Sequence, residues 1–295
     1  MILMTICLVI IYYNEYEYLS ALFATLLEQT VKPDKIIFVN NGSTKDPQKI
    51  IKFCSNFLNI EYINTGKNLL FTRGMNIGIR RALADNFDII GFMNSDMRCD
   101  TNMVDEIEKY FDLHENVVAL TPNIRDLEDT KDVFYPVKYS GIFGSAKRRQ
   151  TFGCSSDTDF LTGASMFVRS KVLWQTGLFY EPYIHGTEDF ELCDKLKQHG
   201  KLKYIYSTNI YHQSIAEKKN KVSLEMERLN SKNWYIYCLR NKKSNLILIK
   251  LALFKNIFDV LINRDPVVKQ QLLGKIDGIR ETWLHLTNRE KFLWI

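Results

Sequence analysis

The sequence predicts an α/β fold in which a mostly parallel β-sheet is covered by helices on both faces. Two observations lead to this prediction. Short apolar runs rich in β-branched residues alternate with longer segments whose apolar residues recur at helical spacing. The connections between these segments are short, which favours crossover units and a parallel sheet. A chain of 295 residues that is 46% hydrophobic and 25% charged can build the core that this fold requires.

The first part of the chain contains predicted strands and helices in strict alternation. Each strand is a short apolar run, and strands are expected at residues 5–12, 35–39, 60–63 and 88–93. The intervening segments carry apolar residues every three or four positions, and helices are expected at residues 18–29, 48–58 and 71–86. Pro33-Asp34 marks the turn between the first helix and the second strand.

The middle of the chain continues the pattern less regularly. A helix is expected at residues 103–111, followed by a strand at residues 117–120 that Thr121-Pro122 closes. Another strand is expected at residues 160–168. Residues 125–159 show no clear period and contain the basic run Lys147-Arg148-Arg149, and a loop of this length inside a domain usually has a function.

The pattern then returns to one more helix and one more strand. The helix is expected to start after Thr187, which can act as its N-cap, with Glu188 and Asp189 in the first turn and Gly200 as the stop. The strand is expected at residues 202–211 and ends at His212.

The chain after residue 215 is predicted to be helical. Helices are expected at residues 224–239 and 246–262, and a last one follows the break at Asp265-Pro266. We therefore expect an α/β domain at residues 1–215 and a C-terminal helical appendage at residues 216–295.

The net charge of +5 is unevenly distributed between these two parts. Residues 213–295 contain 16 Lys and Arg against 8 Asp and Glu, a balance of +8, and the 23 basic and 26 acidic residues that precede them give −3. The basic segment has two interpretations. In the first, the segment packs as a helical cap on the α/β domain or forms a homodimer contact. In the second, it is a membrane-binding surface that lies on the anionic inner face of the cell membrane. Nucleic-acid binding is disfavoured, because the α/β part is acidic overall.

The cysteines and the N-terminus indicate a cytoplasmic protein. The six cysteines are scattered, and no Cys-x-x-Cys pair suggests a zinc or redox site, which fits a reducing compartment. The apolar run at residues 1–11 has no basic residue before it and no small-residue cleavage site after it, so a buried strand is expected there and not a signal peptide. No apolar stretch of about 20 residues predicts a transmembrane helix.

Each of the first four predicted strands ends in polar residues. These strand ends are Asn14-Glu15, Asn40-Asn41-Gly42-Ser43, Asn64-Thr65-Gly66 and Asn94-Ser95-Asp96. An Asx or Ser turn explains any one of them without a function. Because parallel strands place all four ends on one rim of the sheet, together they predict a polar crevice for a nucleotide or a similar ligand.

Three acidic residues and one histidine are candidates for chemistry. Asp96 at a strand end can hold a divalent cation through oxygen ligands, and such a cation would bridge the phosphates of a nucleotide. The pair Glu188-Asp189 can supply a general base, or it can simply stabilise the dipole of a helix start. His212 is either a metal ligand or a packed histidine.

An ordered set of motifs resembles the inverting family 2 glycosyltransferases of GT-A fold, in particular the rhamnosyltransferase-like bacterial group that builds polysaccharide and lipopolysaccharide. The resemblance covers roughly residues 5–212. The matching pieces are Val9 to Asn14, Gln29-Thr30, Pro33-Asp34 to Ser43, Asn64 to Asn68, Arg73 to Gly78, Asn94-Ser95-Asp96 at the D-x-D position, Leu161 to Met166, Gly177 with Phe179, Glu188 to Cys193, His212 and the later Arg240-Asn241.

The resemblance implies a GT-A nucleotide-diphospho-sugar transferase fold and a role for each matched residue. Asp96 would ligate Mg²⁺ or Mn²⁺ on the donor pyrophosphate, with His212 as a further ligand. Asp189 would be the base that deprotonates the acceptor hydroxyl, and Glu188 would lie beside it. The donor site would comprise Asn14, Glu15, Asn40, Asn41, Arg73, Asn94 and Ser95, with Gly163 at the donor–acceptor junction.

Two residues depart from the family pattern. Asn40 and Asn94 stand where the family usually has Asp, and Asn carries no charge, so the metal site keeps one carboxylate where the family has two. The implied reaction is an inverting transfer from a nucleotide-diphosphate sugar to a glycan or lipid-linked acceptor, in lipopolysaccharide, capsule or exopolysaccharide synthesis. The alternatives are a nucleotidyltransferase, which the acidic Asn14-Glu15 loop disfavours, and a non-catalytic nucleotide-sugar binder. Rhamnose, galactose, galactofuranose and glucose all remain open as the donor sugar.

Overall fold

The computed structural model describes residues 4–128, 136–140, 145–148, 154–184, 186–212, 224–240 and 266–287, together with residues 254, 257 and 258. The chain forms two compact units. The first comprises Met1–Ser140, Ala146–Glu181 and Glu188–Lys218, and the second comprises Gly141–Ser145, Pro182–Thr187 and Lys219–Ile295.

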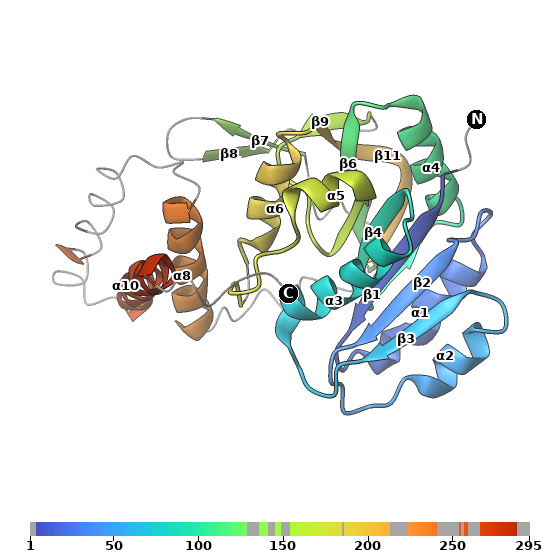
Figure 1. Ribbon diagram of the computed structural model, residues 1–295, viewed down its shortest axis with the longest axis horizontal. Helices are drawn as coiled ribbons and strands as arrows, with labels where there is room; N and C mark the ends of the chain where they lie inside the picture. The colour runs from blue at the N-terminus through green and yellow to red at the C-terminus, as the bar shows by residue number, and fades with distance from the viewer. Residues whose placement is uncertain are drawn as a thin grey trace. The chain divides into compact units, whose positions relative to one another are not determined.

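The first unit is built on a mixed sheet, which confirms the predicted α/β class (Figure 1). Along the main path its strands follow the order β3-β2-β1-β4-β10-β6-β11-β5, and β9 pairs with β11. The first four strands are parallel to one another, whereas β10, β5 and β9 run antiparallel to the strands they pair with. The strands are β1 (Ile6–Tyr12), β2 (Lys35–Asn40), β3 (Ile60–Asn64), β4 (Ile89–Asn94), β5 (Met97–Cys99), β6 (Val117–Asp126), β9 (Ser156–Thr158), β10 (Ser165–Arg169) and β11 (Lys201–His212).

Helices cover both faces of this sheet because its central strands are apolar on both sides. In β1, Leu8 and Ile10 pack on one face and Cys7 and Val9 on the other, each against a different buried cluster. The first face is covered by α1 (Tyr16–Leu27), α2 (Gln48–Cys54) and α4 (Met103–Leu113), and the second by α3 (Leu70–Ala84), α5 (Ser170–Thr176) and α6 (Glu188–Leu196). The first four strands are therefore packed against a buried apolar cluster on each face of the sheet.

Several elements differ from the sequence prediction. Strand β10 begins only at Ser165, and β5, β9 and α5 were not predicted. Strand β6 continues past Thr121-Pro122. Its partner strand β11 changes register between Ile205, which is paired with Pro122, and Asn209. This irregularity accommodates the proline, which has no backbone N–H to donate to a neighbouring strand. Thr187 precedes α6 with a φ of 77°, which is not the extended backbone of an N-cap.

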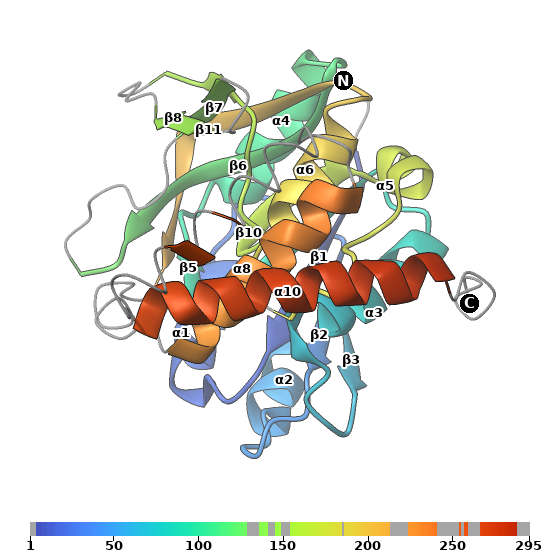
Figure 2. The same cartoon turned by 90° about the vertical axis from the view of Figure 1, so that its left-hand side faces the viewer.

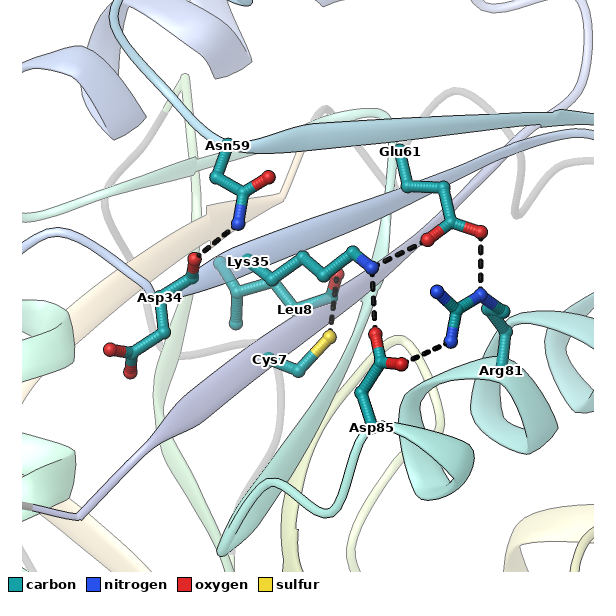
Figure 3. A network of polar contacts seen from close by, with 8 residues as sticks. All are labelled: Cys7, Leu8, Asp34, Lys35, Asn59, Glu61, Arg81 and Asp85. Carbon is teal, nitrogen blue, oxygen red and sulfur yellow. Dashed lines mark hydrogen bonds and ion pairs between the residues drawn. The ribbon is translucent and has the colours of Figure 1, made fainter.

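A charge network fastens α3 to the edge of the sheet (Figure 3). The Lys35 ammonium lies 2.5 Å from Glu61 Oε2 and 2.7 Å from Asp85 Oδ2, and the Arg81 guanidinium donates to the same two carboxylates. These residues come from β2, from β3 and from the C-terminal end of α3. The network lies away from the polar strand ends and stabilises the scaffold that holds them.

The second unit contains two long helices, α8 (Leu224–Arg240) and α10 (Pro266–Thr287), which pack closely (Figure 2). A Cβ added at Gly278 of α10 would lie 2.7 Å from the carbonyl oxygen of Lys232, so glycine is required at this crossing. The ion pairs Arg228–Asp277 and Lys232–Glu281 join the two helices. Among the described residues, no helix is both long and apolar enough to cross a membrane.

Some of the other sequence predictions fall outside the described residues. These are most of the helix expected at residues 246–262, residue 149 of the basic run, and Asn241 of the Arg240-Asn241 pair. The hairpin of β7 (Val137–Ser140) and β8 (Ser145–Arg148) is described within the long 125–159 segment. The membrane-binding surface and the homodimer contact remain predictions.

Candidate functional site

The loops that follow the first four strands meet at one end of the sheet. Asn14 and Glu15 follow β1, and the hydroxyl of Ser95, after β4, donates a 2.6 Å hydrogen bond to the Glu15 carboxylate. The side-chain oxygen of Asn14 accepts hydrogen bonds from the backbone N–H and the hydroxyl of Thr44, which follows β2. Side chains placed on separate strand ends by the sequence thus contact one another across the rim.

Asn40 at the end of β2 is buried and held by two neighbours. Its side-chain oxygen accepts the backbone N–H of Ser43 at 3.0 Å, which closes the loop after β2. Its side-chain amide donates to the hydroxyl of Tyr62 on β3 at 2.9 Å. Asn40 therefore shapes this loop, and Tyr62 is a partner that its sequence position did not reveal.

Asn41 organises the loop that leads into α3. Its side-chain oxygen accepts the backbone N–H of Leu69, and its amide donates to the carbonyl of Leu70 and to the side chain of Asn68. Leu70 has a φ of 66°, a strained conformation for a branched residue, and these hydrogen bonds hold it.

Arg73 lies in the first turn of α3 and is more than half exposed. Its Nε is 3.9 Å from Oε2 of Glu181, whose other carboxylate oxygen accepts hydrogen bonds from Asn76 and Arg80. The guanidinium is thus close enough to Glu181 to be oriented by it and exposed enough to meet an anionic ligand. The sequence prediction did not include Glu181.

Asp96 and His212 form the candidate metal site. Strand β11 pairs with β5 in a register that sets His212 opposite Met97, so the His212 Nε2 lies 3.6 Å from Oδ2 of Asp96. Both side chains are buried, and one oxygen and one nitrogen this close can reach the same cation. The side-chain oxygen of Asn94 is also buried and makes no hydrogen bond to the described part of the chain.

This set of donors fits a divalent cation that takes its remaining ligands from elsewhere. Within the described ranges, no group of three or more His, Cys, Asp or Glu side chains could hold a metal ion. Mg²⁺ and similar ions are commonly bound by one or two protein ligands together with waters and substrate phosphates. The pair Asp96 and His212 therefore suits an ion that arrives with a phosphorylated ligand.

Asp189, in the first turn of α6, is an acid whose pKa is strongly perturbed by its surroundings. Burial, followed by the adjacent Glu188 carboxylate, raises the pKa of Asp189 to about 8, and the backbone N–H of Gly163 acts in the opposite direction. The residue keeps some exposure, but its Oδ1 atom is buried. A carboxyl group that titrates near neutral pH is suited to general acid–base chemistry.

Gly163 lies directly against this carboxylate and connects it to the strand ends. A Cβ added at Gly163 would lie 3.3 Å from Cγ of Asp189 and 3.2 Å from the ring of Phe71. The neighbouring Ala164 accepts the backbone N–H of Asn94 at 3.0 Å. The segment around Gly163 thus joins the β4 end, which carries Asp96, to the helix that carries Asp189.

Comparison with known proteins gives a consistent result. The sequence profile of glycosyl transferase family 2 matches residues 7–177. Chondroitin synthase of Escherichia coli is 21% identical over 78% of this chain, and hyaluronan synthase of Pasteurella multocida is 26% identical over 87% of it. The chain spans 37% and 28% of the lengths of these two relatives.

A solved structure shares the fold. The structure of GalNAc-T7 with UDP, GalNAc and Mn²⁺ superposes with a TM-score of 0.65 at 16% identity, covering 80% of this chain and 48% of that one. At this level of identity the likeness concerns the fold alone. It agrees with the predicted GT-A architecture.

Proposed function

The chain belongs to glycosyl transferase family 2, and from this membership we propose that it transfers a sugar from a nucleoside-diphosphate donor to a hydroxyl group of a glycan or lipid-linked acceptor. The relatives that share its sequence are named as synthases of chondroitin and hyaluronan, which supports a role in building a cell-surface polysaccharide. The rhamnosyltransferase-like subgroup and the donor sugar remain predictions.

The single observation that carries the proposal is the Asp189 carboxyl group. Its oxygen Oδ1 is buried, it lies beside Glu188, and it is joined through Gly163 and Ala164 to the strand end that carries Asp96. A base in this position suits a single displacement. The ionised Asp189 accepts the proton of the acceptor hydroxyl while that oxygen attacks the anomeric carbon. The bond from this carbon to the diphosphate oxygen breaks, and the anomeric configuration is inverted.

The leaving group is a nucleoside diphosphate, and its charge must be offset as it departs. Arg73 is exposed and cationic, so it can move from Glu181 to a phosphate oxygen. A Mg²⁺ or Mn²⁺ ion held by Asp96 and His212 would supply further charge stabilisation to the diphosphate. The buried Asn94 oxygen is available to the same ion or to a donor hydroxyl.

The nucleoside part of the donor is assigned to the loops after β1, β2 and β3. Asn14, Asn40 and Asn41 hold these loops in place through hydrogen bonds to their own neighbours. Glu15 and Ser95 join the β1 and β4 ends where the diphosphate would lie. UDP is the first nucleotide to test, because the similar structure of GalNAc-T7 contains it.

A donor screen tests the proposal directly. The protein is incubated with a panel of UDP- and dTDP-sugars and hydroxyl-bearing oligosaccharides, with Mn²⁺, with Mg²⁺ or with a chelator, and nucleoside diphosphate release and glycan products are measured. We expect acceptor-dependent release that requires a divalent cation and is lost in Asp189→Asn. Binding of a nucleotide sugar without any release would support a non-catalytic binder. Pyrophosphate release from a nucleoside triphosphate and a sugar phosphate would support a nucleotidyltransferase.

A further inference from the structure

The chain segment before β10 docks on helix α6 through three neighbouring contacts. The ring of Phe160 stacks on the ring of Phe190, with centroids 4.4 Å apart. Gly163, three residues after Phe160, lies against Asp189, the residue before Phe190, as described above. Between them, Leu161 contacts Cys193, one helical turn after Asp189.

The Cys193 thiol makes both of the hydrogen bonds that a thiol can make here. Its sulfur accepts the backbone N–H of Leu161 at 3.2 Å and donates to the carbonyl of the same residue at 3.4 Å. The side chain is completely buried, and burial raises the pKa of the thiol, so the donating proton is retained. In the described part of the chain, the sulfur therefore satisfies two backbone groups of Leu161 that would otherwise be buried without partners.

This contact lies one helical turn from the Asp189 carboxylate. Asp189 and Cys193 are four residues apart, so they share one face of α6. A shift or rotation of the helix that broke the Cys193 contact would move Asp189 by a comparable amount. The carboxylate has little freedom on its other side, because Gly163 and the Phe71 ring leave no space even for a methyl group.

We propose that Cys193 is a positioning residue for the reaction. Through its hydrogen bonds to Leu161 it fixes the position of α6 along its axis and the rotation of the helix. Asp189 is thereby held against Gly163 and oriented toward the acceptor hydroxyl. This inference rests on the proposed function of Asp189 as the base. It assigns Cys193 no contact with substrate. Displacement of a catalytic group by about 1 Å is enough to lower a rate by up to 10²-fold, so a modest shift of α6 has a measurable effect.

Cys7 provides a matched control. It is also completely buried, and it lies in β1 at the end of the sheet away from the polar strand ends, where it is paired with Lys35 and Ile90. Replacing either cysteine by alanine removes one sulfur atom from a packed core, so both variants lose some stability. A loss of turnover confined to the Cys193 variant would therefore reflect position and not packing.

The test compares Cys193→Ala, Cys193→Ser and Cys7→Ala with the unmodified protein. The measurements are kcat and KM for the donor identified in the screen, the Kd of UDP, the pH profile of kcat/KM and the Tm. We expect Cys193→Ala to lower kcat about tenfold or more while the donor KM and the UDP Kd stay within about twofold. Its pH profile should move to lower pH, since a loosened Asp189 is better solvated. Serine can make both hydrogen bonds, so Cys193→Ser should recover most of the turnover.

A second variant tests the other side of the same arrangement. Gly163→Ala leaves the Cys193 contact in place but pushes the Asp189 carboxylate away, and it should lower kcat with little effect on the UDP Kd. Equal turnover in Cys193→Ala and Cys7→Ala, or no recovery in a folded Cys193→Ser protein, would overturn the inference. Asp189→Asn separates the two claims. If it abolishes transfer while Cys193→Ala does not, the role of Asp189 as the base stands and the positioning role of Cys193 fails. If it leaves transfer intact, the role of Asp189 as the base fails, and the positioning role fails with it. Absence of transfer by the unmodified protein in the donor screen would overturn the proposed function itself.

Discussion

The imidazole Nε2 of His212 lies 3.6 Å from the carboxylate of Asp96 because strands β11 and β5 pair side by side. Strand β5 directly follows the β4 end, so its register with β11 brings a residue from late in the α/β unit next to the acid at the rim. The pair is buried and offers one oxygen and one nitrogen donor. The first prediction follows from this pairing.

Replacing His212 should weaken binding of the divalent cation. We expect His212→Ala to raise the Mn²⁺ concentration needed for half-maximal transfer by about tenfold or more, because one of two protein ligands is lost. Mn²⁺ binding in the presence of UDP, followed by electron paramagnetic resonance, measures this without turnover. The exposed His199→Ala is the control and should behave like the unmodified protein. An unchanged Mn²⁺ requirement in His212→Ala would remove His212 from the metal site.

The transfer rate should depend on the ionisation of Asp189. Burial and the adjacent Glu188 raise the pKa of Asp189 to about 8, and only the ionised form can accept a proton. We therefore expect kcat/KM to rise tenfold per pH unit below about 8 and to level off above it. Replacing Glu188 with Gln removes a neighbouring negative charge and should shift this limb to lower pH. A flat profile between pH 6 and 8 would contradict the role of Asp189 as the base.

The raised pKa of Asp189 also predicts that the stability of the folded protein falls as the pH rises, whereas the transfer rate increases. Between the ordinary carboxyl pKa of 3.8 and about 8, the folded protein keeps a proton on Asp189 that the unfolded chain releases. Stability contributed by this group is therefore greatest below pH 3.8 and declines as the pH rises towards 8. Asp189→Asn does not titrate, so at pH 8 it should be more stable than the unmodified protein, by on the order of 1 kcal/mol. Urea denaturation at pH 4 and pH 8 checks this, and the difference should nearly vanish at pH 4.

Asn40 should tolerate the acid that the family usually carries. In Asn40→Asp the carboxylate can still accept the Ser43 N–H, and the Tyr62 hydroxyl can rotate to donate where it now accepts. Little change in Tm is therefore expected. Asn40→Leu leaves both partners without a hydrogen bond in a buried site and should cost about 1–3 kcal/mol. Thermal unfolding of the two variants, with Tyr62→Phe as a third, distinguishes these outcomes; a strongly destabilised Asn40→Asp would contradict the assigned contacts.

The charge network of Figure 3 should contribute stability without affecting transfer. Partial burial alone would raise the pKa of Glu61, but hydrogen bonds from Lys35 and Arg81 lower it, and hydrogen bonds from Arg81 and Lys35 also lower the pKa of Asp85. The stability from both acids is present above their ordinary pKa values and is lost as the pH falls through the lowered ones. Lys35→Met should therefore lower the Tm by about 2 °C at pH 7 and by less at pH 3.

The exposed Lys52 on α2 provides the control for this substitution. Lys52→Met removes the same charge and should leave the Tm nearly unchanged at both pH values. Transfer activity should be normal in both variants, because the network lies away from the rim. A Tm difference between the two variants that persists at pH 3 would mean that Lys35 acts by packing and not through its ion pairs.

Local pattern was sufficient to predict the first half of the fold. The four parallel strands and the helices between them lie within a few residues of their expected positions, because each is defined by a continuous apolar run or a helical repeat. The same pattern placed Asn14, Asn40 and Asn94 on one rim, since parallel strands end on the same side. The later strands were harder. The length of β6 and the late start of β10 depend on register with distant partners, which no local pattern contains.

The sequence by itself determined an α/β sheet, its polar rim, and the two acids Asp96 and Asp189 as candidates for chemistry. The tertiary structure decided which residues lie beside them: His212 beside Asp96, Gly163 beside Asp189, and Leu161 against Cys193, one turn further along the helix that carries Asp189. The physical reason is the range of the interactions. Apolar periodicity involves residues only a few positions apart, so it can be recognised in the sequence. The surroundings of a carboxylate depend on strands and helices that come together only when the chain folds.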